Sequence, residues 1–161
     1  KQRSWLDRLE EFPNLIVTQT LSKAYGMAGI RLGICYASEE IIATLNTIKP
    51  PYNVNELTQN KAIENLNNVD LVKNQIDEIL KERENLIEEL NKINFISKIY
   101  PSDANFILIK VDDANKRYNQ LISKGIVIRN RTNQHGCENC LRITIGTRIE
   151  NKRLLKILKE L

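Results

Sequence analysis

The residues best suited to chemistry surround Lys23, in the run TLSKAYGMAGIRLG over residues 20–33. Lysine is the side chain that forms a Schiff base with a carbonyl compound. The hydroxyls of Thr20 and Ser22 and the guanidinium of Arg31 can hold a phosphate dianion beside it. Glycines in the same run let backbone amides approach an anion closely. The run therefore predicts a lysine that bonds covalently to a phosphorylated aldehyde.

Two arginines in the second half of the chain form a further candidate set. Arg129 lies in GIVIRNR and Arg142 in LRITIGT. A guanidinium binds carboxylate or phosphate through a planar fork of two donors, which lysine cannot copy. On pattern alone, Arg142 fits a solvated strand face equally well, and Arg131 could replace Arg129. The pattern alone therefore assigns no binding role to either arginine.

A run between these arginines contains His135, Cys137 and Cys140. The CxxC spacing suits zinc, but a closed structural site needs a fourth ligand, and no second pair is near. A redox CxxC is expected at a helix start after a strand, whereas this pair leads into a strand. We therefore expect a surface loop without a metal, which could still border the substrate because it connects the two arginine strands.

Composition limits the class of protein. The chain has 161 residues, 42% hydrophobic and 27% charged, which is typical of a soluble globular protein. A net charge of +4 and an aromatic content of 6% argue against nucleic-acid binding. No apolar run approaches the roughly 20 residues of a membrane span. Three cysteines are too few for a disulfide framework, so a reduced, cytoplasmic setting is expected.

The first part of the chain predicts short elements that cannot form a domain by themselves. We expect the end of a helix over 4–10, strands over 15–18 and 31–37, and helices over 38–46 and 55–66. The apolar run at 15–18 predicts a buried strand, and two strands with short helices cannot cover both its faces. Residues 1–70 are therefore expected to be part of a larger α/β sheet.

The second part predicts a complete small domain over residues 71–161. A long amphipathic helix over 69–92 precedes it, as apolar residues recur there at helical spacing. The elements then follow the order strand, strand, helix, strand, strand, helix, which closes into an α+β sandwich. The strands are expected over 95–100, 105–111, 125–129 and 141–145, and the helices over 114–124 and 150–161.

The run SKAYGMAGIRLG resembles the Schiff-base signature of fold-type I pyridoxal-phosphate aminotransferases. GIVIRNR and LRITIGT resemble the histidinol-phosphate branch of that family in particular. The resemblance covers essentially the whole chain and corresponds to about the second half of a family member. It implies an α/β fold, with a fragment of the large-domain sheet followed by the complete small C-terminal domain.

The resemblance also implies roles for the candidate residues. Lys23 would bind pyridoxal 5'-phosphate and then act as the base that moves a proton on the substrate. Arg142 would bind the substrate α-carboxylate, and Arg129 the phosphate of histidinol phosphate. The cofactor phosphate would be held by Thr20, Ser22 and Arg31.

The implied reaction is reversible amino transfer between histidinol phosphate and 2-oxoglutarate, in histidine biosynthesis, by a homodimer. Several family parts lie upstream of this sequence, so these residues alone are expected to be inactive. Related alternatives are another class I or II aminotransferase and a threonine-phosphate decarboxylase-like enzyme. The non-enzymatic alternative is a small interaction domain in which Lys23 is idle.

Overall fold

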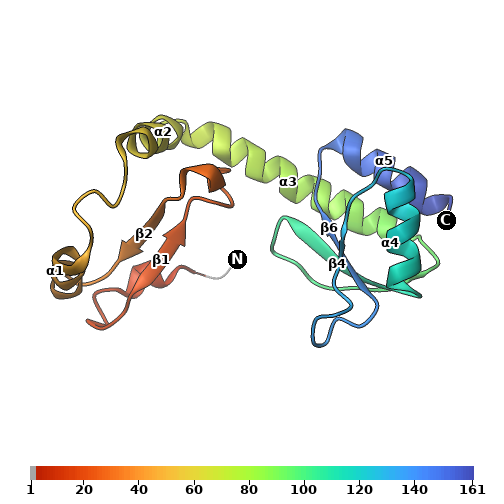
Figure 1. Ribbon diagram of the computed structural model, residues 1–161, viewed down its shortest axis with the longest axis horizontal. Helices are drawn as coiled ribbons and strands as arrows, with labels where there is room; N and C mark the ends of the chain where they lie inside the picture. The colour runs from red at the N-terminus through yellow and green to blue at the C-terminus, as the bar shows by residue number, and fades with distance from the viewer. Residues whose placement is uncertain (1–2) are drawn as a thin grey trace. The chain divides into compact units, whose positions relative to one another are not determined.

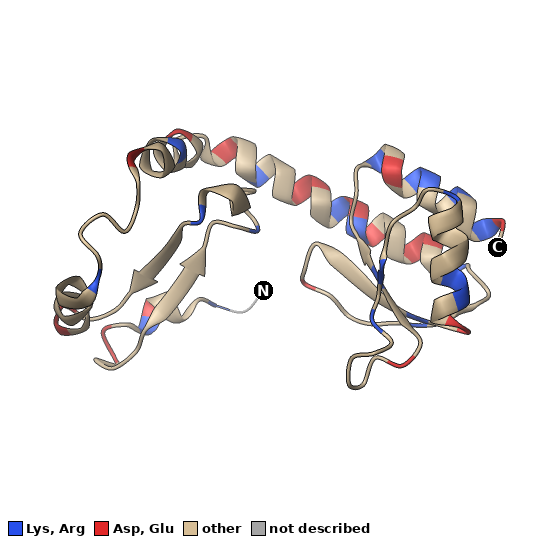
Figure 2. Ribbon diagram, viewed as in Figure 1, with Lys and Arg blue, Asp and Glu red and all other residues tan. Residues whose placement is uncertain are grey.

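The computed structural model describes residues 3–161. Packing divides the chain into an N-terminal unit, Lys1–Lys73, and a C-terminal unit, Asn74–Leu161. The division falls inside the longest described helix, α3 (Val69–Leu90), which carries both acidic and basic residues along its length (Figures 1 and 2). The assignment of the N-terminal unit to a large cofactor-binding domain, with a boundary after residue 70, stays a prediction.

The N-terminal unit is built around a ribbon of two antiparallel strands. In this ribbon Val17 lies opposite Tyr36, and Thr20 lies opposite Gly33. The elements in order are the 3-10 helix η1 (Trp5–Arg8), β1 (Val17–Thr20), the 3-10 turn η2 (Ala28–Ile30), β2 (Gly33–Tyr36), α1 (Glu39–Ile48) and α2 (Glu56–Leu66).

Three expectations for this unit were wrong in detail. The strand predicted over 15–18 lies at Val17–Thr20 and alternates between half-buried and exposed residues, because the ribbon offers only one face for packing. The strand predicted from Arg31 begins at Gly33, since Arg31 has a left-handed backbone. The helix expected over 4–10 is only the 3-10 helix η1, which Ser4 caps by accepting from the Leu6 amide.

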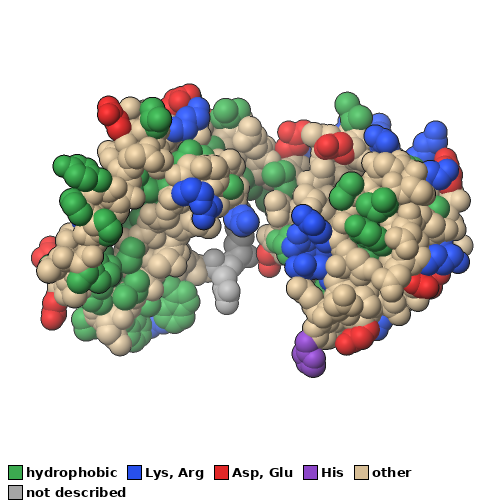
Figure 3. Space-filling model, in the orientation of Figure 1, with side chains coloured by type: hydrophobic (Ala, Val, Ile, Leu, Met, Phe, Trp, Pro, Cys, Tyr) green, Lys and Arg blue, Asp and Glu red, His purple; other side chains and the backbone are tan. Residues whose placement is uncertain are grey.

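Local capping explains where α2 begins. The side chain of Asn55 accepts a hydrogen bond from the Thr58 amide at 2.9 Å, as the sequence predicted for a helix N-cap. Few side chains of this unit are deeply buried, and large apolar residues such as Ile48, Tyr52 and Leu57 are exposed. Figure 3 shows apolar side chains, in green, gathered on the surface of this unit.

The C-terminal unit contains a four-stranded antiparallel sheet in the order β3-β4-β6-β5. The order of elements after α3 confirms the predicted alternation of strands and helices, and Figure 1 shows the arrangement. These elements are β3 (Ile96–Ile99), β4 (Phe106–Val111), α4 (Ala114–Ser123), β5 (Arg129–Asn130), β6 (Cys140–Thr144) and α5 (Arg148–Lys159).

One face of this sheet makes the apolar core, together with α3, α4 and α5. Ile107 and Ile109 of β4 are 0% and 1% exposed, and they lie opposite Ile143 and Leu141 of β6. The alternating residues of β4 lie on the other face, where burial is only partial. The helix residues of the core cluster are Leu86, Leu90, Ala114, Leu121, Leu154 and Leu158.

The strand predicted over 125–129 is much shorter than expected. Gly125 has φ +74° and ends α4, as predicted, because glycine adopts the left-handed region freely. The Ile126 amide then donates to the Leu121 carbonyl, so this segment is still bonded to the end of the helix. Ladder pairing therefore begins only at Arg129.

Candidate functional site

The Lys23 loop, residues 21–32, joins β1 to β2 and is closed at its base. The Leu21 amide donates to the Leu32 carbonyl at 3.4 Å, and the Met27 amide donates to the Leu21 carbonyl at 3.0 Å. Leu21 and Met27 are 1% and 4% exposed, so their burial fixes the loop to the rest of the N-terminal unit. The register places Thr20 beside the strand that Arg31 leads into. Hydroxyl donors and a cation therefore come from the two sides of one ordered loop.

Hydrogen bonds within this loop leave the Thr20 hydroxyl and the Lys23 amine free to bind a ligand. The Ser22 amide donates to Thr20 Oγ1 at 3.1 Å, which leaves the Thr20 hydroxyl hydrogen available to another acceptor. The Gly26 amide donates to the Lys23 carbonyl at 2.9 Å, and Gly26 has φ +65°. The Lys23 side chain is exposed and has no carboxylate partner among residues 3–161.

Arg31 has an unusual backbone conformation. Its φ is 55°, in the left-handed region that costs a residue with a Cβ roughly 1 kcal/mol or more. Its guanidinium donates to the Ala28 carbonyl at 3.1 Å and is not paired with any carboxylate in the described part of the chain. Backbone strain of this kind is common where a side chain must be held for binding.

Sequence reasoning missed a residue that supports this loop. Thr58, on α2, is 8% exposed, and its hydroxyl donates to the Ile30 carbonyl at 3.2 Å. The bond fixes the segment immediately before Arg31. No local signal identifies this contact, because it joins residues that are far apart in sequence.

The second candidate set is brought together by the sheet. Arg129 of β5 lies directly opposite Arg142 of β6. Directly opposed residues of antiparallel strands project to the same face, and like charges there destabilise the pair. The two arginines therefore form a cationic pair, which an anion bound between the guanidinium groups would stabilise.

The surroundings of Arg142 strengthen this interpretation. Its Cζ lies 4.9 Å from the centroid of the Phe106 ring, a cation–π contact worth about 0.5–2 kcal/mol. Its Nε is buried and has no hydrogen-bond partner within the described residues. A buried donor without a partner is rare and requires an explanation, and a bound anion provides one. Phe106 was not predicted, since nothing in the sequence sets the register of β4 against β6.

The segment after β5 keeps one alternative open. Arg131 is half-buried, and its amide donates to the Cys140 carbonyl at 2.9 Å. Thr132 Oγ1 is buried and, like Arg142 Nε, has no partner among the described atoms. Arg131 thus remains the alternative to Arg129, and Thr132 adds a hydroxyl donor that sequence reasoning missed.

The loop that carries the cysteines differs from the expected surface loop. His135 is exposed, but Cys137 is half-buried, and Cys140 is 0% exposed as the first residue of β6. The surface-loop prediction was therefore wrong for Cys140. Between residues 3 and 161, no group of three or more His, Cys, Asp or Glu side chains is placed to hold a metal ion.

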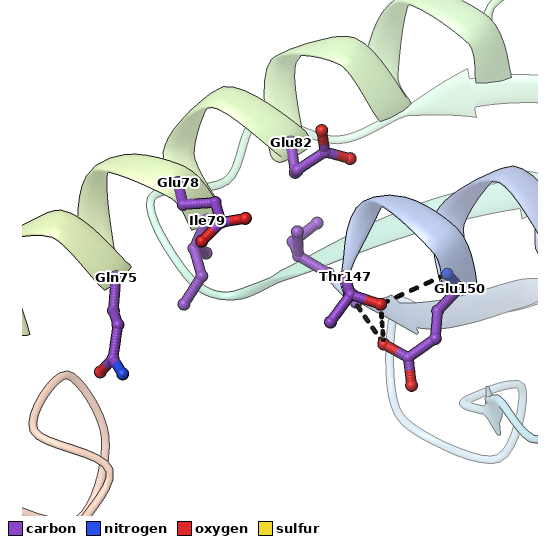
Figure 4. Close-up of a pocket in the computed structure, with 8 residues that line it drawn as sticks. Gln75, Glu78, Ile79, Glu82, Thr147 and Glu150 are labelled. Atoms are coloured by element: carbon purple, nitrogen blue, oxygen red, sulfur yellow. Dashed lines mark hydrogen bonds between the residues drawn. The ribbon is translucent and has the colours of Figure 1, made fainter.

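A pocket in the C-terminal unit lies apart from these residues. It has a volume of about 350 Å³ and lies between α3, which supplies Gln75, Glu78 and Glu82, and the start of α5 (Figure 4). Thr147 and Glu150 form a capping box there, and the Thr147 amide lowers the pKa of the Glu150 carboxyl. These polar groups serve the helix start, and none of the predicted site residues lines the pocket.

Comparison with known proteins decides the family. Residues 2–158 match the family model described as aminotransferase class I and II. The chain belongs to this family. Members of this aminotransferase family depend on pyridoxal phosphate. The predicted membership of the family and the predicted α/β fold class are both confirmed.

Individual relatives agree with the family match. The chain is 64% identical over 159 residues to a histidinol-phosphate aminotransferase of Flavobacterium johnsoniae, covering 99% of this chain and 46% of that protein. The crystal structure of a histidinol-phosphate aminotransferase from Clostridium acetobutylicum matches with a TM-score of 0.86 at 30% identity, over 98% of this chain and 48% of that one.

A further solved relative carries the cofactor. It is a histidinol-phosphate aminotransferase from Sinorhizobium meliloti in complex with pyridoxal-5'-phosphate, with a TM-score of 0.77 at 25% identity, over 92% of this chain and 41% of that chain. The chain spans about half the length of the curated relatives it matches, so its fold is a partial one. None of the described helices is long and apolar enough to cross a membrane.

The donor set of the Lys23 loop fits pyridoxal phosphate. Lys23 supplies a primary amine, and Thr20 and Ser22 supply hydroxyls. Arg31 supplies a cation that has no carboxylate partner among the described residues, as a phosphate requires. The opposed Arg129 and Arg142 fit a carboxylate or phosphate group of a substrate. The residues present therefore match both the cofactor and an anionic substrate.

Proposed function

We propose that the longer protein to which this chain corresponds transfers an amino group between histidinol phosphate and 2-oxoglutarate, using pyridoxal phosphate. The observation that carries the proposal is the cross-strand pair of Arg129 and Arg142, in which a buried nitrogen of Arg142 has no hydrogen-bond partner among the described residues. The reaction's substrates bear phosphate or carboxylate groups, which such a pair binds well. The identity to curated relatives favours this reaction over the other aminotransferases and over the decarboxylase.

The Lys23 loop holds the cofactor in this proposal. Bound pyridoxal phosphate supplies an aldehyde carbon and a ring that withdraws electrons from the substrate. Thr20 and Ser22 donate hydroxyl hydrogens to the phosphate, and Arg31 neutralises part of its charge. Lys23 Nζ would hold the aldehyde end of the cofactor, and it would accept the proton that leaves the substrate α-carbon.

The arginine pair orients the substrate. Arg142 binds a carboxylate of glutamate or 2-oxoglutarate, with Phe106 supporting the plane of the guanidinium. Histidinol phosphate lacks a carboxylate, so in that half-reaction Arg129 binds the phosphate. Both substrates can then use one cationic face, because carboxylate and phosphate share the geometry that a guanidinium fork recognises.

The proposal includes a homodimer in the cytoplasm. Dimerisation is typical of the family, and exposed apolar side chains such as Tyr52 and Leu57 give the N-terminal unit surface that association can bury. All three cysteines are free thiols, as a reducing compartment requires. Analytical ultracentrifugation of the complete enzyme tests the dimer, and a monomer at micromolar concentration contradicts it.

The decisive experiment uses a chimera that supplies the rest of the enzyme. The chain replaces the matching 159 residues of the Flavobacterium johnsoniae protein. We expect amino transfer from histidinol phosphate to 2-oxoglutarate, and Arg142→Lys should lower kcat/KM by about 30- to 1000-fold, or about 2–4 kcal/mol, because lysine cannot form the two-donor fork.

Controls separate the competing functions. Arg148→Lys changes an exposed arginine at the start of α5 and should leave kcat/KM unchanged. Release of carbon dioxide from phosphothreonine would favour the decarboxylase. An active wild-type chimera in which Arg142→Lys has no effect would contradict the role of the arginine pair. An inactive chimera that folds and binds no cofactor would favour the interaction domain.

A further inference from the structure

The pair Cys137 and Cys140 plays no part in the proposed amino transfer, and the structure gives it an ordered setting. Three successive turns make up the loop between β5 and β6. The Gln134 amide donates to the Arg131 carbonyl, the Cys137 amide to the Gln134 carbonyl and the Cys140 amide to the Cys137 carbonyl, at 2.8, 3.0 and 3.0 Å. The last of these turns has the two cysteines at its ends.

This last turn is held in place by Asn139. Asn139 has φ 57°, the left-handed conformation that the third residue of a type II turn requires. Its carbonyl accepts from the Val111 amide at 2.9 Å, and its side chain accepts from the Ala114 amide at 3.3 Å. Asn139 thus fixes the turn to the end of β4 and the start of α4, and the amide bond from Cys140 to the Cys137 carbonyl holds its two ends together.

The ends of the turn are close enough for a disulfide. The end residues of a hydrogen-bonded β-turn have Cα atoms less than about 7 Å apart, and disulfides span about 4.4–6.8 Å. The Cys140 thiol donates to the Glu138 carbonyl at 3.6 Å, so its sulfur is directed back over its own turn. Both thiols are free in this structure.

We propose that Cys137 and Cys140 are a thiol–disulfide modification site, which a peroxide converts to a disulfide that closes the turn. Cys137 is half-buried and meets the oxidant first, whereas Cys140 is fully buried and acts as the resolving thiol. The disulfide forms at the base of the loop that leads into the strand of Arg142, two residues further along β6.

The steps balance with hydrogen peroxide as the oxidant. The Cys137 thiolate attacks one peroxide oxygen and breaks the O–O bond, which gives a sulfenic acid and hydroxide. The Cys140 sulfur then attacks the sulfenic sulfur, the S–S bond forms, and the departing hydroxide takes the thiol proton as water. Overall, two thiols lose two electrons and two protons, and one peroxide becomes two molecules of water.

The test exploits the position of the arginines. Trypsin cleaves after Arg131 and Arg142, so both cysteines fall in the single peptide 132–142, while exposed Cys35 falls in another. The reduced 161-residue chain is treated with one equivalent of hydrogen peroxide, alkylated with iodoacetamide, digested and analysed by mass spectrometry. We expect most of the 132–142 peptide to be two hydrogens lighter, unalkylated, and restored to two alkylation sites by dithiothreitol.

Variants make the outcome decisive. Cys137→Ser changes only a half-buried loop side chain, and it should abolish the disulfide and leave Cys140 alkylatable after unfolding. Cys35→Ser should leave the yield of disulfide unchanged. The proposal is overturned by Cys137 accumulating as sulfinic acid beside a free Cys140 thiol, or by a disulfide that joins Cys137 to Cys35 or to a second chain. It is also overturned when the disulfide forms only after the circular dichroism of the fold has been lost.

Discussion

The two units of this chain differ in what holds them together. All residues of the main apolar cluster belong to the C-terminal unit, where one sheet face packs under α3, α4 and α5. In the N-terminal unit only a few apolar residues are buried, among them Leu21 and Met27, which fix the Lys23 loop. Burial of apolar area is the dominant stabilising contribution. The C-terminal unit therefore supplies most of the stability, while the N-terminal unit carries Lys23, the amine that we propose binds the cofactor.

A core truncation in each unit tests this difference and has the largest expected effect. Ile143→Ala in the C-terminal core should lower the free energy of unfolding by about 2–5 kcal/mol, since it leaves a cavity. The matched change Ile48→Ala, at a side chain 73% exposed, should cost less than about 0.5 kcal/mol. Urea unfolding followed by far-ultraviolet circular dichroism measures both, and equal costs would refute the comparison.

The Lys23 loop allows a sharper test within the N-terminal unit. Gly26 and Gly29 both have open space where a Cβ would lie, but only Gly26 has a positive φ, +65°. Gly26→Ala should therefore cost about 1–2 kcal/mol through backbone strain alone, and Gly29→Ala almost nothing. Fluorescence of the single tryptophan, Trp5, during urea unfolding reports on this unit. A smaller cost for Gly26→Ala than for Gly29→Ala would show that the loop backbone is not fixed as described.

A smaller effect is expected from ion pairs of the C-terminal unit that are lost at low pH. The buried Arg117 bonds to both oxygens of Asp112 at 2.9 and 2.7 Å and lowers the pKa of that carboxyl to about 2. Because the pKa in the folded state is depressed, the stabilisation is present above about pH 4 and is lost as the pH falls toward 2. Bonds with Lys159 and Lys92 also lower the pKa of Glu89 to about 2.

The corresponding variant is Asp112→Asn. The Asp112 side chain is 45% exposed, so solvent screening reduces the expected loss to about 1 kcal/mol at neutral pH. The variant should also show a weaker loss of stability between pH 4 and 2, and the double variant with Glu89→Gln a weaker one still. Urea midpoints measured across this range check the prediction. A steeper acid dependence in Asp112→Asn would contradict it.

Local signals made much of the fold predictable from the sequence. Asn55 before α2 and Gly125 after α4 act through bonds within a few residues, so their patterns can be read directly. Long-range pairing could not be read in this way. The opposition of Arg129 and Arg142 depends on where β5 begins, and the sequence predicted that strand several residues too early.

For the candidate site, too, local features could be predicted from the sequence and long-range contacts could not. The residue types around Lys23 predicted a cofactor site in this loop, because an amine beside hydroxyls and a guanidinium is a rare combination. The left-handed backbone of Arg31 and the supporting bond from Thr58 depend on packing between distant segments. The burial of Cys140 was missed for a similar reason, since the turns that lead into β6 are set by bonds to Val111 and Ala114.

The most direct test of the account is the identity of the amine that carries the cofactor. The chimera with the Flavobacterium johnsoniae protein is loaded with pyridoxal phosphate, reduced with borohydride, digested and analysed by mass spectrometry. We predict a pyridoxyl adduct on Lys23, absent in Lys23→Ala, although that variant keeps the fold. An adduct on any other lysine, or none in a folded wild-type chimera, would contradict the central claim.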